Sequence, residues 1–248
     1  MKAVLLCGGF AKRLWPITLH QAKPLLKINK RPVIDYIIGK LNLPEIDEII
    51  ISTNQKFEKM FQEWMNKQDI DKKMTLAVEP AKKEGEKFGV IKALKFLIDK
   101  YKLKDDLLVI GGDNLFDFSI KDFLRFYHEK NALCVAVYDL GSLEKAKLYG
   151  IMDIDEDGLV TSFVEKPENP KSTLASTCCY VFPKHMLDFF GVYINEGHPK
   201  DNPGSFLQWF FKRNPIYAYS FDGHWFDIGN KEQMKKAEEW VKKERIMP

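Results

Sequence analysis

The residues best suited to binding phosphate lie in one loop near the N-terminus. Two adjacent glycines, Gly8 and Gly9, are followed there by Arg13 and then by Lys23. Glycines let the backbone approach a ligand closely and direct N–H groups at anionic oxygens. Arginine offers a planar fork for phosphate oxygens, and lysine offers a compact charge. The loop therefore predicts a phosphate-binding site.

The spacing in this loop separates several interpretations. Adjacent glycines alone are typical of a structural turn, but here Arg13, Pro16, Thr18 and Lys23 accompany them. The loop lacks the second glycine of GxxxxGK[ST], and Ala11 breaks GxGxxG. The second mismatch argues against a dinucleotide-dependent oxidoreductase, which only the alternation of strands and helices would suggest.

The elements that must hold this loop alternate along the chain. Residues 3–7 (AVLLC) form an apolar run that is typical of a strand buried on both faces. We expect further strands at 48–52, 74–78, 106–110 and 132–138, and helices at 33–41, 57–64 and 90–98. This order predicts an α/β fold whose mostly parallel sheet has helices on both faces.

The pattern changes after about residue 142. Short strands are predicted at 151–155, 159–164 and 178–182, followed by an amphipathic helix at 231–243. No Ser/Gly-rich linker or block of charge divides the chain. We therefore expect one domain over residues 1–248, with a β-rich C-terminal extension.

Composition excludes several classes of protein. The 248 residues are 45% hydrophobic and include 18 Phe, which is enough for a core and argues against disorder. A net charge of +3 does not indicate nucleic-acid binding. The four cysteines and five histidines show no zinc-ligand spacing. Since no long apolar segment or signal peptide is present, we expect a cytoplasmic protein that does not enter a membrane.

The N-terminal loop resembles the signature of sugar-1-phosphate nucleotidylyltransferases, which reads roughly GGxGTRLxPxTxxxPKP. The matching positions are Gly8, Gly9, Arg13, Leu14, Pro16, Thr18, Lys23 and Pro24. Ala11, Lys12 and Ala22 stand where the family has Gly, Thr and Pro. The methyl group of Ala11 would hinder backbone approach if this position requires a positive φ.

Later segments resemble the same family, in the expected order, up to about residue 240. They are Gly112-Asp113, Tyr149-Gly150-Ile151, Glu165-Lys166-Pro167 and Trp225-Phe226-Asp227-Ile228-Gly229. The resemblance implies a three-layer, Rossmann-like nucleotidyltransferase fold. It also implies an enzyme that joins a nucleoside triphosphate to a hexose 1-phosphate of glucose or mannose type. Residues 1–140 would bind the nucleotide, and residues 141–248 the sugar.

The resemblance also implies which residues act. The catalytic residues would be Arg13, Lys23, Asp113, Lys166 and Asp227. The nucleotide would be bound by Leu6, Gly8, Gly9, Arg13, Lys23, Glu79 and Gly112. The sugar phosphate would be bound by Gly150, Glu165, Lys166, Thr177 and Tyr180. Asp113 and Asp227 would hold Mg²⁺.

The chemistry of the two aspartates agrees with a metal site. Asp113 follows one apolar run and Asp227 interrupts another, 114 residues later. Carboxylates at strand ends lie at the rim of a sheet, and Mg²⁺ is commonly held by one or two carboxylates plus substrate phosphates. Taken alone, each aspartate is as typical of a solvent-exposed helix cap or turn as of a metal ligand.

Two further positions bear on selectivity. The Glu165-Lys166 pair is also compatible with a plain surface strand end, and Cys178 stands where the family usually has Gly. Glu79 begins the loop that holds the base in the family. A carboxylate only accepts hydrogen bonds, so Glu79 favours guanine, whose pairing edge carries two adjacent donors.

The sequence leaves three matters open. The departures at Ala11, Lys12 and Ala22 suggest an alternative, a non-catalytic nucleotide-sugar sensor or regulatory subunit on the same fold. The base and the sugar are not determined: glucose 1-phosphate with dTTP or UTP is a common family pairing, whereas Glu79 favours GTP with mannose 1-phosphate. A homo-oligomer is compatible with the resemblance.

Overall fold

The computed structural model describes residues 1–244, so the last four residues of the predicted domain, 245–248, lie outside the described part. The helices are α1 (Val33–Ile38), α2 (Glu58–Met65), α3 (Val90–Tyr101), α4 (Ile120–Lys130), α5 (Leu143–Ala146), α6 (Phe189–Asn195), α7 (Pro203–Phe210) and α8 (Lys231–Lys243). The strands are β1 (Lys2–Leu6), β2 (Lys27–Ile28), β3 (Arg31–Pro32), β4 (Glu48–Asn54), β5 (Lys73–Glu79), β6 (Leu107–Gly111), β7 (Asn114–Phe116), β8 (Leu133–Asp139), β9 (Gly150–Ile154), β10 (Val160–Glu165), β11 (Leu174–Phe182), β12 (Ile216–Ser220) and β13 (Trp225–Asp227).

The chain divides into two compact units, and each is assembled from separate stretches. The first unit consists of Met1–Lys87, Ile110–Asp117 and the chain from His224 onward. The second unit consists of Phe88–Val109 and Phe118–Gly223. These boundaries differ from the division at residue 140, which concerns what each half binds and stays a prediction.

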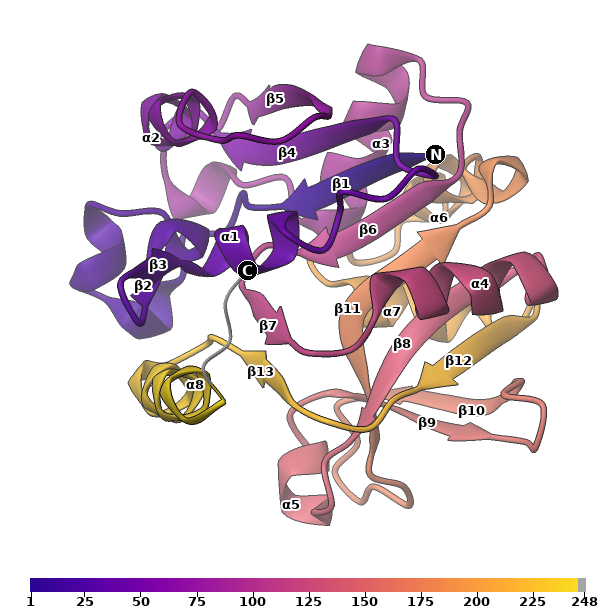
Figure 1. Ribbon diagram of the computed structural model, residues 1–248. Coiled ribbons are helices and arrows are strands. Elements are labelled where there is room, and N and C mark those ends of the chain that lie inside the picture. Colours follow the sequence, from indigo (N-terminus) through magenta and orange to yellow (C-terminus); the bar gives the residue numbers. More distant parts are fainter. Residues whose placement is uncertain (245–248) are drawn as a thin grey trace. The chain divides into compact units, whose positions relative to one another are not determined.

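The first unit is built on parallel strands. β1 pairs with β4 and β4 with β5, all in parallel, and the end of β6 lies beside β1 (Figure 1). Every residue of β4 is buried, as are the three central residues of β1. The apolar runs at 3–5 of β1 and 49–51 of β4 are typical of strands covered on both faces. The strands predicted at 3–7, 48–52 and 74–78 are confirmed.

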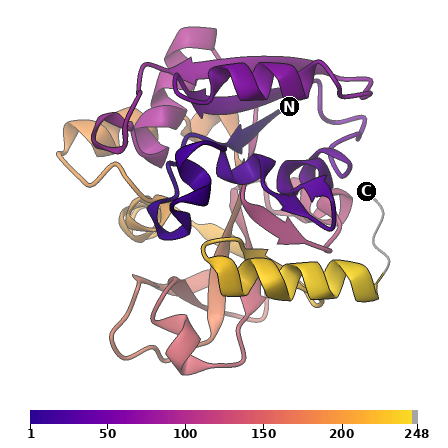
Figure 2. The same cartoon turned by 90° about the vertical axis from the view of Figure 1, so that its left-hand side faces the viewer.

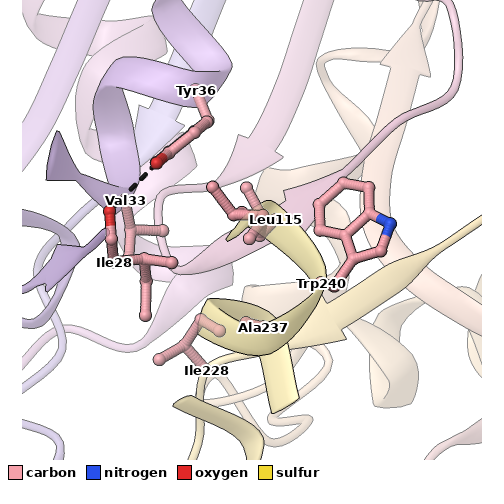
Figure 3. Close-up of a cluster of buried hydrophobic side chains, with 8 residues drawn as sticks. Ile28, Val33, Tyr36, Leu115, Ile228, Ala237 and Trp240 are labelled. Carbon is pink, nitrogen blue, oxygen red and sulfur yellow. Dashed lines mark hydrogen bonds between the residues drawn. The ribbon is translucent and has the colours of Figure 1, made fainter. Parts of the chain in front are cut away.

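The C-terminal helix closes a separate core in the first unit. α8 is a continuous helix (Figure 2). Ala237, Trp240 and Val241 of α8 pack in one cluster with Leu115 of β7 and with Ile228 (Figure 3). The cluster also contains Ile28, Val33 and Tyr36. Because Leu115 and Ile228 lie close in sequence to Asp113 and Asp227, this packing fixes the backbone that carries both aspartates.

The second unit contains a mixed set of strands. β11 pairs antiparallel with β8 and β9, β10 pairs antiparallel with β9, and β12 pairs parallel with β8. In the strand order of the sheet, β6 is a neighbour of β11. α7 begins after Asn202, whose side chain accepts a hydrogen bond from Ser205 N, and Pro203 occupies its first position.

The architecture confirms the predicted α/β class, with a mixed, mostly parallel sheet and interspersed helices. The helix predicted at 231–243 has those bounds. Several elements were not predicted, among them α4, α7 and β12. Within residues 1–244, no helix has the length and apolar character needed to cross a membrane.

Candidate active site

A two-stranded ladder in the first unit brings the two predicted metal ligands together. β13 pairs antiparallel with β7, and Asp227 lies opposite Asn114, which directly follows Asp113. The backbone N–H of Ile228 donates to the carbonyl of Asp113 at 3.1 Å. The indole Nε1 of Trp225 donates to Asn114 Oδ1 at 2.6 Å. This ladder overcomes the long sequence separation of the two aspartates.

Lys23 connects the two carboxylates. Its Nζ lies 2.5 Å from Asp113 Oδ2 and 3.5 Å from Asp227 Oδ1. The Lys23 side chain is 10% exposed, so its charge is largely shielded from water. Burial alone lowers the pKa of a lysine, but Asp113 and Asp227 overcome this effect and raise the pKa of Lys23 above its ordinary value. Lys23 is therefore held as a cation.

Arg13 adds a second cation to this group. A Cβ placed on Gly229 would lie 3.2 Å from Arg13 Nη2 and 3.5 Å from Asp227 Oδ2, so the guanidinium and the carboxylate flank the same glycine. Burial first, and then the charge of Asp113, raise the pKa of Asp227; Lys23 and Arg13 partly offset the rise. Four predicted catalytic residues, Arg13, Lys23, Asp113 and Asp227, thus form one charged cluster.

The N-terminal loop has a specific backbone conformation. Ala11 adopts φ 47° and ψ 52°, the left-handed conformation that favours glycine. Its carbonyl accepts a hydrogen bond from Thr18 Oγ1 at 2.8 Å and another from Leu14 N at 2.9 Å. These bonds explain the threonine of the motif and show that Ala11 occupies the required turn in spite of its methyl group.

Several of the predicted nucleotide-binding residues lie around the start of this loop. The side chain of Asn54 donates to the carbonyl of Gly8 at 2.9 Å. A Cβ on Gly8 would come within 2.7 Å of Glu79 Oε1, so the backbone passes directly over that carboxylate. Glu79 is buried at the end of β5. Gly112 donates from its N–H to the carbonyl of Leu6 at 3.0 Å.

The residues present fit a hard divalent cation. Residues 1–244 contain no group of three or more His, Cys, Asp or Glu side chains arranged to hold a metal. Asp113 and Asp227 nevertheless supply two carboxylates that share one cation, the ammonium of Lys23. Mg²⁺ takes oxygen ligands and accepts one or two carboxylates with the remainder from phosphates and water. The magnesium site stays a prediction that this donor set supports.

A second group of predicted residues gathers in the second unit. Glu165, the last residue of β10, lies opposite Gly150 of β9. A Cβ on Gly150 would be 2.9 Å from Glu165 Oε2. Lys166 Nζ lies 3.7 Å from Glu165 Oε1, and the Lys166 side chain is 57% exposed. Burial raises the pKa of Glu165, and the charge of Lys166 only partly offsets this.

β11 carries the other predicted sugar-binding residues. Thr177 Oγ1 donates to the carbonyl of Ala136 at 2.8 Å, and the Tyr180 hydroxyl lies 3.3 Å from Ser176 Oγ. Both side chains are buried. Cys178, between them, has φ 54° at a point where the pairing of β11 with β8 is irregular. This conformation explains the glycine usual in the family; contact of Thr177 and Tyr180 with a sugar stays a prediction.

Two residues of α7 that the sequence did not indicate also contact this group. Gly204 lies against the carboxylate of Glu165, and Gln208 Oε1 accepts a hydrogen bond from Glu165 N at 2.9 Å. In the first unit, the direct ion pairs of Lys23 with both aspartates were likewise not predicted. A single sequence carries no pattern that links such distant positions.

The chain matches the family described as nucleotidyl transferase over residues 2–244. It is 29% identical to the D-glycero-alpha-D-manno-heptose 1-phosphate guanylyltransferase of Campylobacter jejuni, over 92% of this chain and 95% of that protein. It is 27% identical to the UTP–glucose-1-phosphate uridylyltransferase of Synechocystis, over 92% of this chain and 60% of that protein. The chain spans 54–65% of the length of the first curated relatives that it matches.

Solved structures of other proteins share the fold of this chain. A UDP-glucose pyrophosphorylase solved in complex with UDP-glucose superposes with a TM-score of 0.80 at 20% identity, covering 98% of this chain and 99% of that one. At this level of identity the likeness concerns the fold alone.

Proposed function

Because the chain belongs to the nucleotidyl transferase family, we propose that it joins a nucleoside triphosphate to a sugar 1-phosphate, forming a nucleotide sugar and pyrophosphate. The observation that carries this proposal is the cluster in which Lys23 bridges Asp113 and Asp227 beside Arg13. It gathers two cations and two carboxylates from four separate stretches of the chain. Such a cluster suits the binding of a triphosphate.

The reaction is an in-line displacement. A phosphate oxygen of the sugar 1-phosphate attacks the α-phosphorus and forms a new P–O bond. The bond from the α-phosphorus to the bridging oxygen breaks, and pyrophosphate leaves with the electron pair. No covalent intermediate with the enzyme is needed, so catalysis consists of positioning and charge stabilisation.

The protein's own residues supply positive charge around these phosphates. Arg13 binds the leaving pyrophosphate, since its fork suits two phosphate oxygens. Lys23, kept charged by its acidic neighbours, contacts the phosphates near the reacting centre. Lys166 is exposed enough to move to a second anionic substrate and to reduce repulsion between the two. Mg²⁺, held by Asp113 and Asp227, would neutralise part of the phosphate charge.

Glu79 supports guanine as the base. Its side chain is buried directly beneath Gly8, in the loop that carries Arg13. The relative from Campylobacter jejuni is named as a guanylyltransferase, whereas the one from Synechocystis is named as a uridylyltransferase. We therefore expect GTP to be the preferred triphosphate, because only guanine offers two adjacent donors to a carboxylate.

A pyrophosphate-release assay tests this function. GTP, UTP, dTTP, ATP and CTP are each combined with glucose 1-phosphate and with mannose 1-phosphate, with Mg²⁺ and with EDTA. We expect release only when both substrates and Mg²⁺ are present, with GTP ahead of the other triphosphates. Binding of a nucleotide sugar without any release would favour the sensor instead. Release from UTP or dTTP alone would contradict the assignment of the base and leave the reaction class intact.

A further inference from the structure

The carboxylate of Glu165 lies against the first turn of α7. Gly204 is the second residue of this helix, after Pro203. A Cβ placed on Gly204 would lie 1.8 Å from Glu165 Oε2 and 2.5 Å from Glu165 Cδ. No side chain of any size fits there while Glu165 keeps its position. Glycine is therefore required at 204 by a carboxylate that lies 39 positions earlier in the sequence.

Two further contacts restrict Glu165, one at its backbone and one at its carboxylate. Gln208, one turn further along α7, accepts the backbone hydrogen bond of Glu165, which fixes the end of β10 against the helix. On the other side, a Cβ at Gly150 would lie 2.9 Å from the same oxygen, Oε2. Glu165 thus lies in a slot formed by two glycines from different elements. Its side chain keeps 17% exposure.

The position of this slot also has an electrostatic consequence. Burial in the slot raises the pKa of Glu165, and the charge of Lys166 only partly offsets this rise. A shift of the carboxylate out of the slot and into water would change its direction and would remove the burial that raises its pKa.

We propose that Gly204 and Gln208 are positioning residues that direct the Glu165 carboxylate at the hydroxyl groups of the sugar 1-phosphate. This inference rests on the proposed function and deepens it, because it assigns the accuracy of sugar binding to α7. Both residues belong to the second unit, whereas Arg13, Lys23, Asp113 and Asp227 belong to the first. The effect of changing them is therefore specific to one of the two substrates.

The experiment compares Gly204→Ala with Gly191→Ala. Gly191 lies in α6, and a Cβ there meets only the flexible end of Lys95 at 3.1 Å. With glucose 1-phosphate and mannose 1-phosphate as probes, we expect Gly204→Ala to raise the KM for the sugar phosphate about tenfold or more. The KM for the triphosphate should stay within about twofold, and Gly191→Ala should resemble the unmodified protein. An unchanged sugar-phosphate KM would overturn the proposal.

A double-mutant cycle excludes a general distortion of α7. If Gly204 acts only through Glu165, Gly204→Ala should have no further effect in a Glu165→Ala background. An equal effect in both backgrounds would show that the methyl group disturbs the unit as a whole. Should Gly204→Ala fail to fold, Gln208→Leu in the same cycle tests the positioning, with the same outcomes expected.

A measurement without turnover separates this inference from the proposed function. The carboxyl carbons are labelled with ¹³C, and the Glu165 resonance is titrated with pH. Gly204→Ala should move the pKa of Glu165 down toward its ordinary value as the carboxylate moves into water, and Gly191→Ala should not. If no combination of substrates releases pyrophosphate, the proposed function fails, while this titration still decides whether α7 positions Glu165. An identical pKa in both variants would contradict it.

Discussion

The two units hold the carboxylates predicted to be functional by different means. In the first unit, the β7–β13 ladder brings Asp113 and Asp227 together, and both carboxylates are ion-paired to the ammonium of Lys23. In the second unit, Glu165 is held by Gly150 and by α7, and its ion pair with Lys166 is long and exposed. Opposite charge organises the first group, and shape organises the second. Substitutions that change a charge should therefore disturb the first unit most, and substitutions that slightly change side-chain volume should disturb the second unit most.

The largest expected effect comes from Asp113→Asn. Loss of one carboxylate from the charged cluster should reduce turnover about a hundredfold or more, which corresponds to about 3 kcal/mol of transition-state stabilisation. Pyrophosphate release measures the loss, and circular dichroism confirms that the variant is folded. Asp69→Asn, an exposed aspartate of the same unit, is the matched control. Near-normal turnover in Asp113→Asn would remove Asp113 from the site.

Lys23→Met and Lys166→Met together test whether ion pairing stabilises the first unit more than the second. Without Lys23, two repelling carboxylates lose their cation, which should lower the free energy of unfolding by about 2 kcal/mol at neutral pH. This is less than for a fully buried pair, because the carboxylates are 31% and 28% exposed. Lys166→Met should change it by no more than about 0.5 kcal/mol. Urea denaturation measures both, and equal losses would contradict the difference between the units.

Glu165→Gln tests the role of burial through pH. Because the pKa of Glu165 is raised in the folded protein, the folded state holds its proton longer than the unfolded state. The stability this provides is present below the ordinary pKa and is lost as pH rises through the raised pKa. Glu165→Gln should therefore gain stability relative to the unmodified protein as pH rises through this window. Thermal denaturation between pH 3.5 and 8 measures the stability of both proteins. If the stability of Glu165→Gln and that of the unmodified protein change with pH in the same way, the pKa of Glu165 is not raised by folding.

The smallest expected effect is at Ala11. Since this residue has φ 47°, Ala11→Gly should raise the free energy of unfolding by about 0.5–1 kcal/mol. Ala22, with φ −62° in the same loop, is the control, and Ala22→Gly should lower it by a similar amount. Urea denaturation again measures both. A loss of stability in Ala11→Gly would show that the packing contacts of the Ala11 methyl group stabilise the fold by more than its left-handed backbone conformation costs.

Much of the fold was predictable because strong patterns decide it. The apolar runs of β1 and β4 and the helical spacing of α8 are long enough to identify each element. α7 was missed for a physical reason. It has only eight residues, too few for helical periodicity to stand out, although Asn202 and Pro203 are typical of a helix start. A helix this short is stabilised mainly by the tertiary packing of its apolar residues.

The site was predictable in part. The N-terminal signature indicated Arg13 and Lys23, later segments of the resemblance indicated Asp113 and Asp227, and the structure brings these four together. The signature did not indicate that Lys23 bridges the aspartates, since a motif names positions without their partners. It also did not indicate Gly204, because steric need for a glycine arises only once the fold places Glu165 beside it.

The short ladder between β7 and β13 has a consequence for synthesis on the ribosome. A nascent chain that ends before β13 carries Lys23 and Asp113 but has neither Asp227 nor the strand that pairs with β7. The helix that completes the core around Leu115 is also still missing at that stage. The cluster of Lys23, Asp113 and Asp227 can therefore assemble only after β13 has been translated, and chains that end before β13 are expected to lack it.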